Sequence, residues 1–66
     1  MAYKAMYKSE TIVPVKAKNS PDRSGTELFT LHEGTKVLIH ETVAGYANIE
    51  VGNYNGWIPL TTLERI

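Results

Sequence analysis

Tyr46, Trp57 and Pro59 are the residues whose types and spacing best support a chemical role in this chain. Aromatic rings and proline form flat grooves that accept an extended, polyproline-like peptide. Because side chains alternate between the two faces of a strand, Tyr46 and Trp57 point outward if Ile49 and Ile58 point inward. Pro59 shares the side of Trp57. The alternative is that Trp57 caps the core, since a small domain needs its large rings for burial.

Two carboxylates complete the candidate ligand surface. Asp22 and Glu27 flank Arg23 in a polar stretch of the chain. One hypothesis makes them the acidic rim of a peptide groove. The other gives them hydrogen bonds that stabilise their own loop, which is the usual role of such residues in turns.

Residues for catalysis are harder to find. Ser9, Ser20 and Ser24 lie in polar sequence without a nucleophile-elbow pattern, and no glycine run precedes a helix that could hold a phosphate. We therefore expect a protein that is not an enzyme, with no catalytic residue and no cofactor.

The two histidines could form a metal site only together with a third ligand. His32 falls in an expected turn and His40 on the outward side of an expected strand, so a site would need a third ligand such as Glu33 or Glu41. Two solvent-exposed histidines are the favoured interpretation, and no metal is expected. The chain has no cysteine, which excludes disulfides and thiolate sites.

Short β-strands must position these residues. Val, Ile and Thr are frequent from Thr11 onward, and Gly, Asn, Pro and Asp interrupt them at short intervals, as in all-β domains. We expect an all-β fold with five strands that curl into a small barrel, because an open sheet of this size leaves an unpaired edge. A single 3₁₀ turn is expected over 60–63, and a hairpin turn over 52–56. The expected strand segments are 11–18, 36–41, 46–51, 57–59 and 64–66, and residues 28–31 are a short apolar stretch between the first two.

The first segment, residues 11–18, alternates clearly. Val13, Val15 and Ala17 should face the core while Lys16 and Lys18 face water. Pro14 cannot donate a hydrogen bond to a neighbouring strand, so this segment should lie at an edge. A loop over residues 19–26 follows it.

Residues 1–10 differ from the rest of the chain. Tyr3, Met6 and Tyr7 stand at i, i+3 and i+4, the spacing of a helical stripe. Ten residues are too few for a stable isolated helix. We expect residues 1–10 to be a helical or disordered tail, or the end of a preceding helix, and residues 11–66 to form the barrel domain.

Composition excludes several functions. The 66 residues suit one small domain, and seven Lys and Arg balance seven Asp and Glu. Zero net charge argues against a nucleic-acid partner, although five of the basic residues lie in the first 23 positions. Lysines on a solvated strand face are the favoured explanation of that cluster. No apolar run exceeds three residues, so no direct membrane insertion is expected.

Two segments, 34–37 (GTKV) and 56–59 (GWIP), give the chain a resemblance to the bacterial SH3-like domain, called SH3b, over about residues 12–66. The resemblance implies a five-stranded SH3-like barrel. Segments 20–22, 25–29 and 31–35 more narrowly resemble the C-terminal SH3 domain of tetratricopeptide-repeat proteins from Bat-type aerotolerance operons. Tyr46 stands where a tryptophan is usual, and Thr62 where eukaryotic SH3 domains carry a ligand-stacking tyrosine. Binding of proline-rich peptides is therefore not carried over intact.

The resemblance implies a noncatalytic protein–protein interaction module in a larger, envelope-associated repeat protein, located in the bacterial cell envelope or periplasm. The expected partner is a protein or peptide. A second hypothesis is cell-wall targeting through peptidoglycan stem peptides, and a third is a structural accessory that positions a neighbouring enzyme. Adjacent helical repeats in the full-length protein would favour docking, whereas adjacent hydrolase domains would favour wall targeting.

Overall fold

The structure, a computed structural model, describes residues 7–65, which form seven β-strands and one 3₁₀ turn. This confirms the all-β prediction and the 3₁₀ turn, here called η1. Among these residues no helix is long and apolar enough to cross a membrane. The elements are β1 (Tyr7–Thr11), β2 (Val15–Lys18), β3 (Glu27–Leu31), β4 (Lys36–Val43), β5 (Tyr46–Val51), β6 (Tyr54–Pro59), η1 (Leu60–Thr62) and β7 (Leu63–Arg65).

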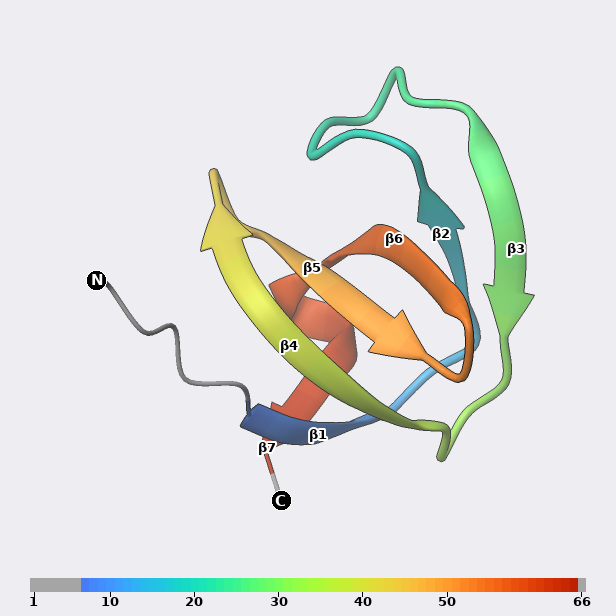
Figure 1. The fold of residues 1–66 in the computed structure, drawn as a ribbon, viewed down its shortest axis with the longest axis vertical. Coiled ribbons are helices and arrows are strands. Elements are labelled where there is room, and N and C mark those ends of the chain that lie inside the picture. The colour runs from blue at the N-terminus through green and yellow to red at the C-terminus, as the bar shows by residue number, and fades with distance from the viewer. Residues whose placement is uncertain (1–6, 66) are drawn as a thin grey trace.

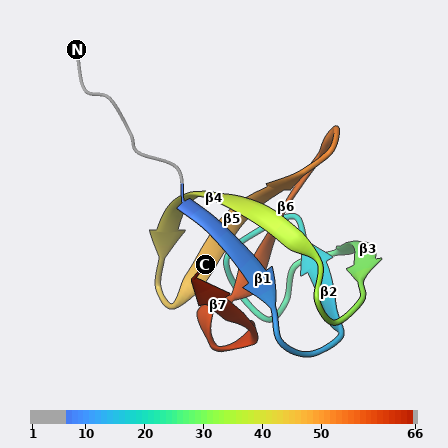
Figure 2. The ribbon, with the colours of Figure 1, turned by 90° about the horizontal axis from the view of Figure 1, so that it is seen from below.

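All seven strands belong to one antiparallel sheet with the order β3-β2-β6-β5-β4-β1-β7 (Figure 1). β1 lies between β4 and β7, as Figure 2 shows from below. The expectation of a closed barrel of five strands is wrong. The strands in the described part of the chain number seven, and the curled sheet ends at β3 and β7, which are not hydrogen-bonded to each other.

β1 corrects the expectation of a tail over residues 1–10. Residues 7–11 form a strand that pairs with β4 on one side and β7 on the other. The side chains of Ser9 and Thr11 are buried, so β1 is part of the domain interior. Strand pairing on both sides outweighs the helical spacing of Tyr3, Met6 and Tyr7 in the sequence. The rest of the predicted tail, residues 1–6, lies outside the described residues.

The segment 11–18 is not one strand. β1 ends at Thr11 and β2 begins at Val15, with Pro14 in the break because it has no N–H to donate. Val13 is 42% exposed, so the expectation that it faces the core is wrong. Ala17 is fully buried and Val15 partly buried against the core, as the alternation predicts.

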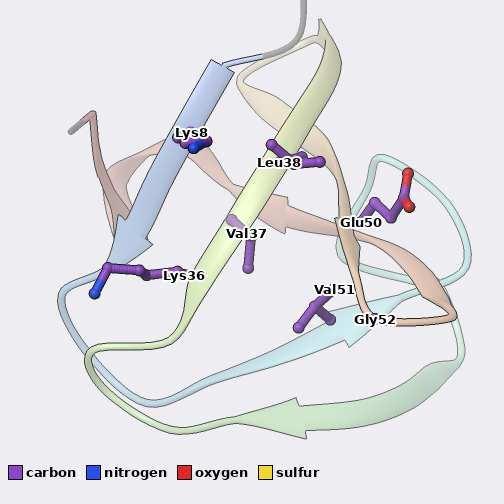
Figure 3. Close-up of a pocket in the computed structure, with 7 residues that line it drawn as sticks. All are labelled: Lys8, Lys36, Val37, Leu38, Glu50, Val51 and Gly52. Atoms are coloured by element: carbon purple, nitrogen blue, oxygen red, sulfur yellow. The ribbon is translucent and has the colours of Figure 1, made fainter.

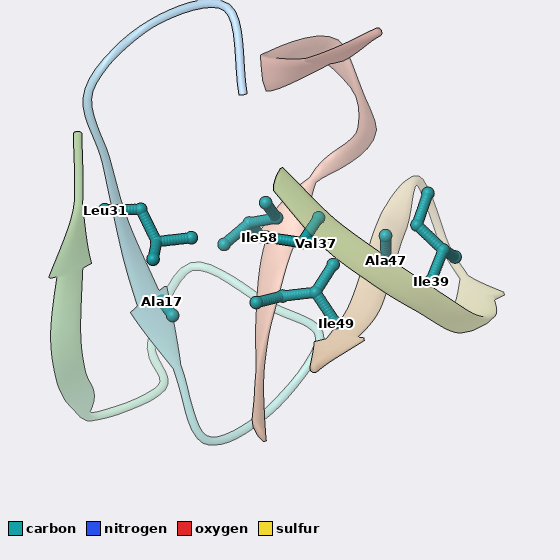
Figure 4. Packing of buried hydrophobic residues seen from close by; sticks show 7 residues of the cluster. All are labelled: Ala17, Leu31, Val37, Ile39, Ala47, Ile49 and Ile58. Atoms are coloured by element: carbon teal, nitrogen blue, oxygen red, sulfur yellow. The ribbon is translucent and has the colours of Figure 1, made fainter. Parts of the chain in front are cut away.

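The core lies inside the curled sheet (Figure 4). Strands β4, β5 and β6 each contribute alternate residues to it, as the period-2 pattern predicts. Because these positions are fixed inward, the residues between them must face outward. The buried hydrophobic residues are Ala17, Leu31, Val37, Ile39, Ala47, Ile49 and Ile58.

Candidate functional site

Tyr46, Trp57 and Pro59 lie together on the outer face of β5 and β6. Tyr46 and Pro59 are direct cross-strand partners, and Trp57 is two residues before Pro59 on β6. Ala47 and Ile58 between them are fully buried, which confirms the predicted outward orientation of all three residues. The three outward side chains are half-buried.

Two turns hold this end of the sheet. β4 and β5 are joined by Ala44 and Gly45, with φ values of 53° and 83°, the positive values of a tight two-residue hairpin. The carbonyl of Gly45 accepts a hydrogen bond of 2.9 Å from the N–H of Leu60. Thr62 Oγ1 donates to the carbonyl of Pro59 at 2.6 Å. The hairpin and η1 are thereby fixed beside Tyr46 and Pro59.

Trp57 lies between two polar neighbours. It is the partner of Asn48 on β5 and of Lys18 on β2. Its side chain is half-buried and is not among the buried residues of the core. The side chain therefore matches neither the fully exposed nor the core-capping expectation, because it is half-buried and lies outside the core cluster.

The loop between β2 and β3, residues 19–26, is fastened next to Trp57. Lys18 Nζ donates a 2.8 Å hydrogen bond to the carbonyl of Arg23. The loop is closed at its base by Asn19, whose N–H donates to the Thr26 carbonyl at 3.0 Å and whose Oδ1 accepts from the Thr26 N–H at 2.9 Å. The loop is thus tied to Lys18, the cross-strand partner of Trp57.

Asp22 stabilises the interior of that loop. Its Oδ1 accepts hydrogen bonds from the Ser24 N–H at 3.0 Å, the Ser24 hydroxyl at 2.9 Å and the Ser20 hydroxyl at 3.3 Å. The hydrogen bond from the Ser24 side chain is the main cause that lowers the pKa of Asp22. These contacts support the loop-stabilising hypothesis for Asp22 over the ligand-rim hypothesis.

Glu27 begins β3, opposite Lys18 in the register of the two strands. Its Oε1 lies 3.6 Å from Lys16 Nζ, and both side chains are largely exposed. An exposed pair of this kind contributes at most about 1 kcal/mol. Glu27 is therefore near the aromatic face through Lys18, with its charge balanced by Lys16.

Sequence analysis missed Lys18 and Asn48, which flank Trp57, and the ring contact between Phe29 and Tyr54, whose centroids are 5.4 Å apart. The outward alternation of Lys18 was visible in the sequence. Its pairing with Trp57 was not, because β2 and β6 are far apart in the chain and no turn joins them.

The histidines have separate environments. His32 is exposed, as expected, and its carbonyl accepts hydrogen bonds from the hydroxyls of Thr11 and Thr35 at 2.7 and 2.6 Å. His40 is half-buried rather than exposed, and its Nε2 lies 2.6 Å from Oε1 of Glu50. Within residues 7–65 no group of three or more His, Cys, Asp or Glu side chains is arranged to hold a metal ion.

Comparisons with protein-family models, with curated proteins and with solved structures found no match to this chain.

Proposed function

We propose that this chain is a noncatalytic, SH3-like interaction module that docks a protein partner through the aromatic face of Tyr46, Trp57 and Pro59. The observation that carries the proposal is the direct pairing of Tyr46 with Pro59 on the same outer face as Trp57. A proline ring beside a tyrosine and a tryptophan gives a flat apolar surface on which an extended peptide can lie.

The arrangement of strands supports the SH3-like part of the proposal. β6, β5, β4, β1 and β7 are consecutive neighbours in the sheet, and η1 connects β6 to β7. The β2–β3 hairpin lies within the long connection between β1 and β4. By the resemblance of segments 34–37 and 56–59 to SH3b, we assign these five neighbouring strands of the open, seven-stranded sheet to the SH3-like part and the β2–β3 hairpin to the long loop.

The geometry of the face suits a docking role. Large aromatic side chains that are positioned by their neighbours lose little conformational freedom on binding, which is why they often dominate interfaces. Trp57 is half-buried on a strand that pairs on both sides, with Asn48 and Lys18 as its cross-strand partners. Asn48 adds an amide that can donate to and accept from a peptide backbone.

The noncatalytic part of the proposal is supported by the serines of the loop. The hydroxyls of Ser20 and Ser24 donate to the carboxylate of Asp22, an arrangement without an imidazole to act as base. The envelope location, the partner within a larger repeat protein and the C-terminal position of the domain are proposed from the SH3b resemblance alone.

Photo-crosslinking tests the proposal directly. Tyr46 is replaced by the photoreactive residue p-benzoylphenylalanine, and the chain is irradiated with a bacterial envelope protein fraction and, separately, with purified cell-wall sacculi. We expect specific crosslinks to protein that disappear when Trp57→Ala is added. Tyr54→Ala is the matched control, because Tyr54 is an aromatic residue of the same strand that is 64% exposed and lies at the opposite end of β6.

Folding must be checked alongside binding. Because Trp57 is half-buried, Trp57→Ala should lower the free energy of unfolding by about 1–2 kcal/mol, measured by urea denaturation. Crosslinking to sacculi that depends on Trp57 would replace the docking function by wall targeting. Crosslinking that survives in a folded Trp57→Ala chain, or is equally lost in Tyr54→Ala, would remove the aromatic face as the site.

A further inference from the structure

A hollow of about 290 Å³, hereafter the Ser9 hollow, lies on the inner side of β4, β1 and β7, and η1 borders it. In Figure 2 these three strands lie side by side, with β1 in the middle. The volume is larger than the apolar cavity of about 150 Å³ that holds benzene, and it is close to about 300 Å³, the lower limit for ligand pockets. The described lining residues are Ser9, Ile39, Thr42, Leu60, Leu63 and Arg65.

Strand register places the lining side chains on one side of the sheet. Ser9 is buried, and Arg65 is its cross-strand partner on β7. Thr42 is the partner of Ala47, which is fully buried. Leu63 packs against the core. Because cross-strand partners share a side of the sheet, these residues all face the interior side and form one continuous wall.

The groove in Figure 3 is larger, at about 530 Å³, but its lining does not form one surface. Val37 is a core residue, and Val51 packs against the core. Leu38 follows Val37 on β4 and therefore faces the opposite side of the sheet. On that outer face Lys36 is the cross-strand partner of Glu10, which places an opposite charge beside it. The smaller hollow is therefore the better-formed site.

Burial separates the base of the Ser9 hollow from its mouth. Ser9 is 1% exposed and Ile39 is 6% exposed, so they lie at the base. Leu60 is 39% exposed, and Thr42 and Arg65 are exposed as well, so they form the mouth. The long side chain of Arg65 can keep its charge in solvent. The base therefore combines aliphatic carbon with one neutral hydroxyl.

The two buried hydroxyls of β1 differ in their hydrogen bonds. Thr11 Oγ1 donates to the carbonyl of His32 at 2.7 Å and accepts from the N–H of Thr35 at 2.9 Å. Ser9 Oγ is also buried, but it has no hydrogen-bond partner within residues 7–65. A buried hydroxyl without a partner destabilises a fold, and such groups often mark a function. A molecule bound in the hollow could supply the missing partner.

We propose that the Ser9 hollow binds a small, neutral aliphatic molecule that ends in a hydroxyl or carbonyl oxygen. The oxygen forms a hydrogen bond with Ser9 Oγ, which turns into the hollow by rotation between staggered rotamers. The aliphatic part packs on Ile39, Leu60 and Leu63. This site does not depend on the aromatic face of Tyr46, Trp57 and Pro59.

The chemistry of the base favours this class of ligand over water and over ions. A buried water needs two to four polar partners, whereas the base offers the hydroxyl of Ser9 between aliphatic neighbours. A charged group placed there would lose its hydration without an opposite charge at the base. A neutral molecule with one oxygen needs only one partner, and its carbon atoms match Ile39 and Leu63.

A titration followed by ¹H–¹⁵N correlation spectra of the whole chain tests the proposal. The probe is 3-methylbutan-1-ol. The matched probes are 3-methylbutanoate and 3-methylbutan-1-amine, which have the same branched chain but carry a negative and a positive charge at neutral pH. We expect the alcohol to shift the amide signals of Ser9, Ile39 and Leu63 in a saturable way, and both charged probes to bind about tenfold more weakly.

Ser9→Ala identifies the hydrogen bond. This variant should bind the alcohol about fivefold more weakly, the effect of one neutral hydrogen bond. Ser24→Ala is the matched control, because the Ser24 hydroxyl donates to Asp22 in the loop of residues 19–26. It should bind the alcohol as the original chain does. The same spectra verify that each variant is folded.

Stability without the probe distinguishes a binding role of Ser9 from a structural one. Ser9→Ala should raise the midpoint of urea denaturation, because it removes a buried hydroxyl that has no partner. Thr11→Val should lower the midpoint, because it leaves the partners of a satisfied hydroxyl unpaired. A lower midpoint for Ser9→Ala would mean that the hydroxyl is bonded within the folded chain and would overturn the proposal.

Four binding results would also overturn it. Equal affinity of the original and Ser9→Ala chains for the alcohol would remove the role of Ser9. Signal shifts that lie elsewhere would remove the hollow. Tighter binding of the carboxylate would assign the site to an anion held by Arg65. Nuclear Overhauser effects from residues 1–6 to Ile39 without the probe would show that the chain fills the hollow itself. A Trp57→Ala chain should bind the alcohol as the original does, so failure here is separable from failure of the aromatic face.

Discussion

The β4–β5–β6 meander and the β2–β3 hairpin are parts of the same sheet that are attached in different ways. In the meander, β5 and β6 are partners from Tyr46 and Pro59 to Val51 and Tyr54, and tight turns join successive strands. The hairpin meets the meander through one pair, Lys18 with Trp57. The meander supplies most of the core, whereas the hairpin contributes its buried Ala17 and Leu31.

This difference separates two structural roles. The meander provides a fixed base on which Tyr46, Trp57 and Pro59 are presented. The hairpin brings the loop of residues 19–26 beside that base, and its position depends on close packing rather than on a long hydrogen-bonded ladder. A ligand that contacts the meander and the hairpin would meet the aromatic face and a surface loop. Such loops vary more in sequence than the strands that they connect.

The largest expected effect comes from removing a buried side chain from the core in the meander and, separately, in the hairpin. Ile49→Ala in the meander should lower the free energy of unfolding by about 4 kcal/mol, because Ile49 is fully buried and its surroundings cannot collapse into the cavity. Leu31→Ala in the hairpin should cost about 2 kcal/mol, since the edge strand β3 can move inward. Urea denaturation measures both. Equal losses would show that the hairpin is as integral to the core as the meander.

The contact between the two regions gives the next effect. A Cβ atom at Gly56 would lie 2.8 Å from the Cβ of Ala17 and 3.3 Å from the ring of Phe29. Gly56→Ala should therefore force β2 away from β6 and cost about 1–3 kcal/mol in thermal unfolding.

The compensating variant Ala17→Gly makes this prediction specific to the contact. In a double-mutant cycle, Ala17→Gly should recover part of the stability lost in Gly56→Ala, because it removes the atom that the new Cβ meets. Strictly additive losses would show that the two strands do not meet as closely as the structure has them.

The parts of the fold that could be predicted from the sequence are the local ones. The outward positions of Tyr46 and Trp57 were predicted from alternation against Ile49 and Ile58. The structure agrees with this prediction because β5 and β6 are hairpin partners that are close in the chain. The same alternation failed at Val13, because Pro14 ends the pairing and period-2 counting takes no account of a break.

Non-local pairing could not be predicted. The helical spacing around Tyr7 carried no information about β4 and β7, the strands that make residues 7–11 a strand. For the candidate site, the aromatic face was found from composition and parity, but the neighbours of Trp57 were not. Lys18 reaches Trp57 through a pairing between β2 and β6, which are distant in the chain.

The smallest expected effect is a pH dependence of the loop of residues 19–26 that the meander does not share. Hydrogen bonds from Ser24 lower the pKa of Asp22 from its ordinary value of 3.8 in the folded chain. A carboxyl whose pKa is lowered on folding stabilises the fold fully above its unfolded pKa and loses that contribution as the pH falls through its folded pKa. As the pH falls below about 4, the Ser24 amide should therefore become less protected relative to the intrinsic exchange rate of an unprotected amide at the same pH, while the Ile49 amide in the meander stays protected. Asp22→Asn, which keeps an acceptor oxygen but removes the charge, should abolish the pH dependence at Ser24. If the pKa of Asp22, followed by NMR, is at or above its ordinary value, the loop is not held by this carboxylate. The loop would then be held by the hydrogen bonds of Lys18 and Asn19.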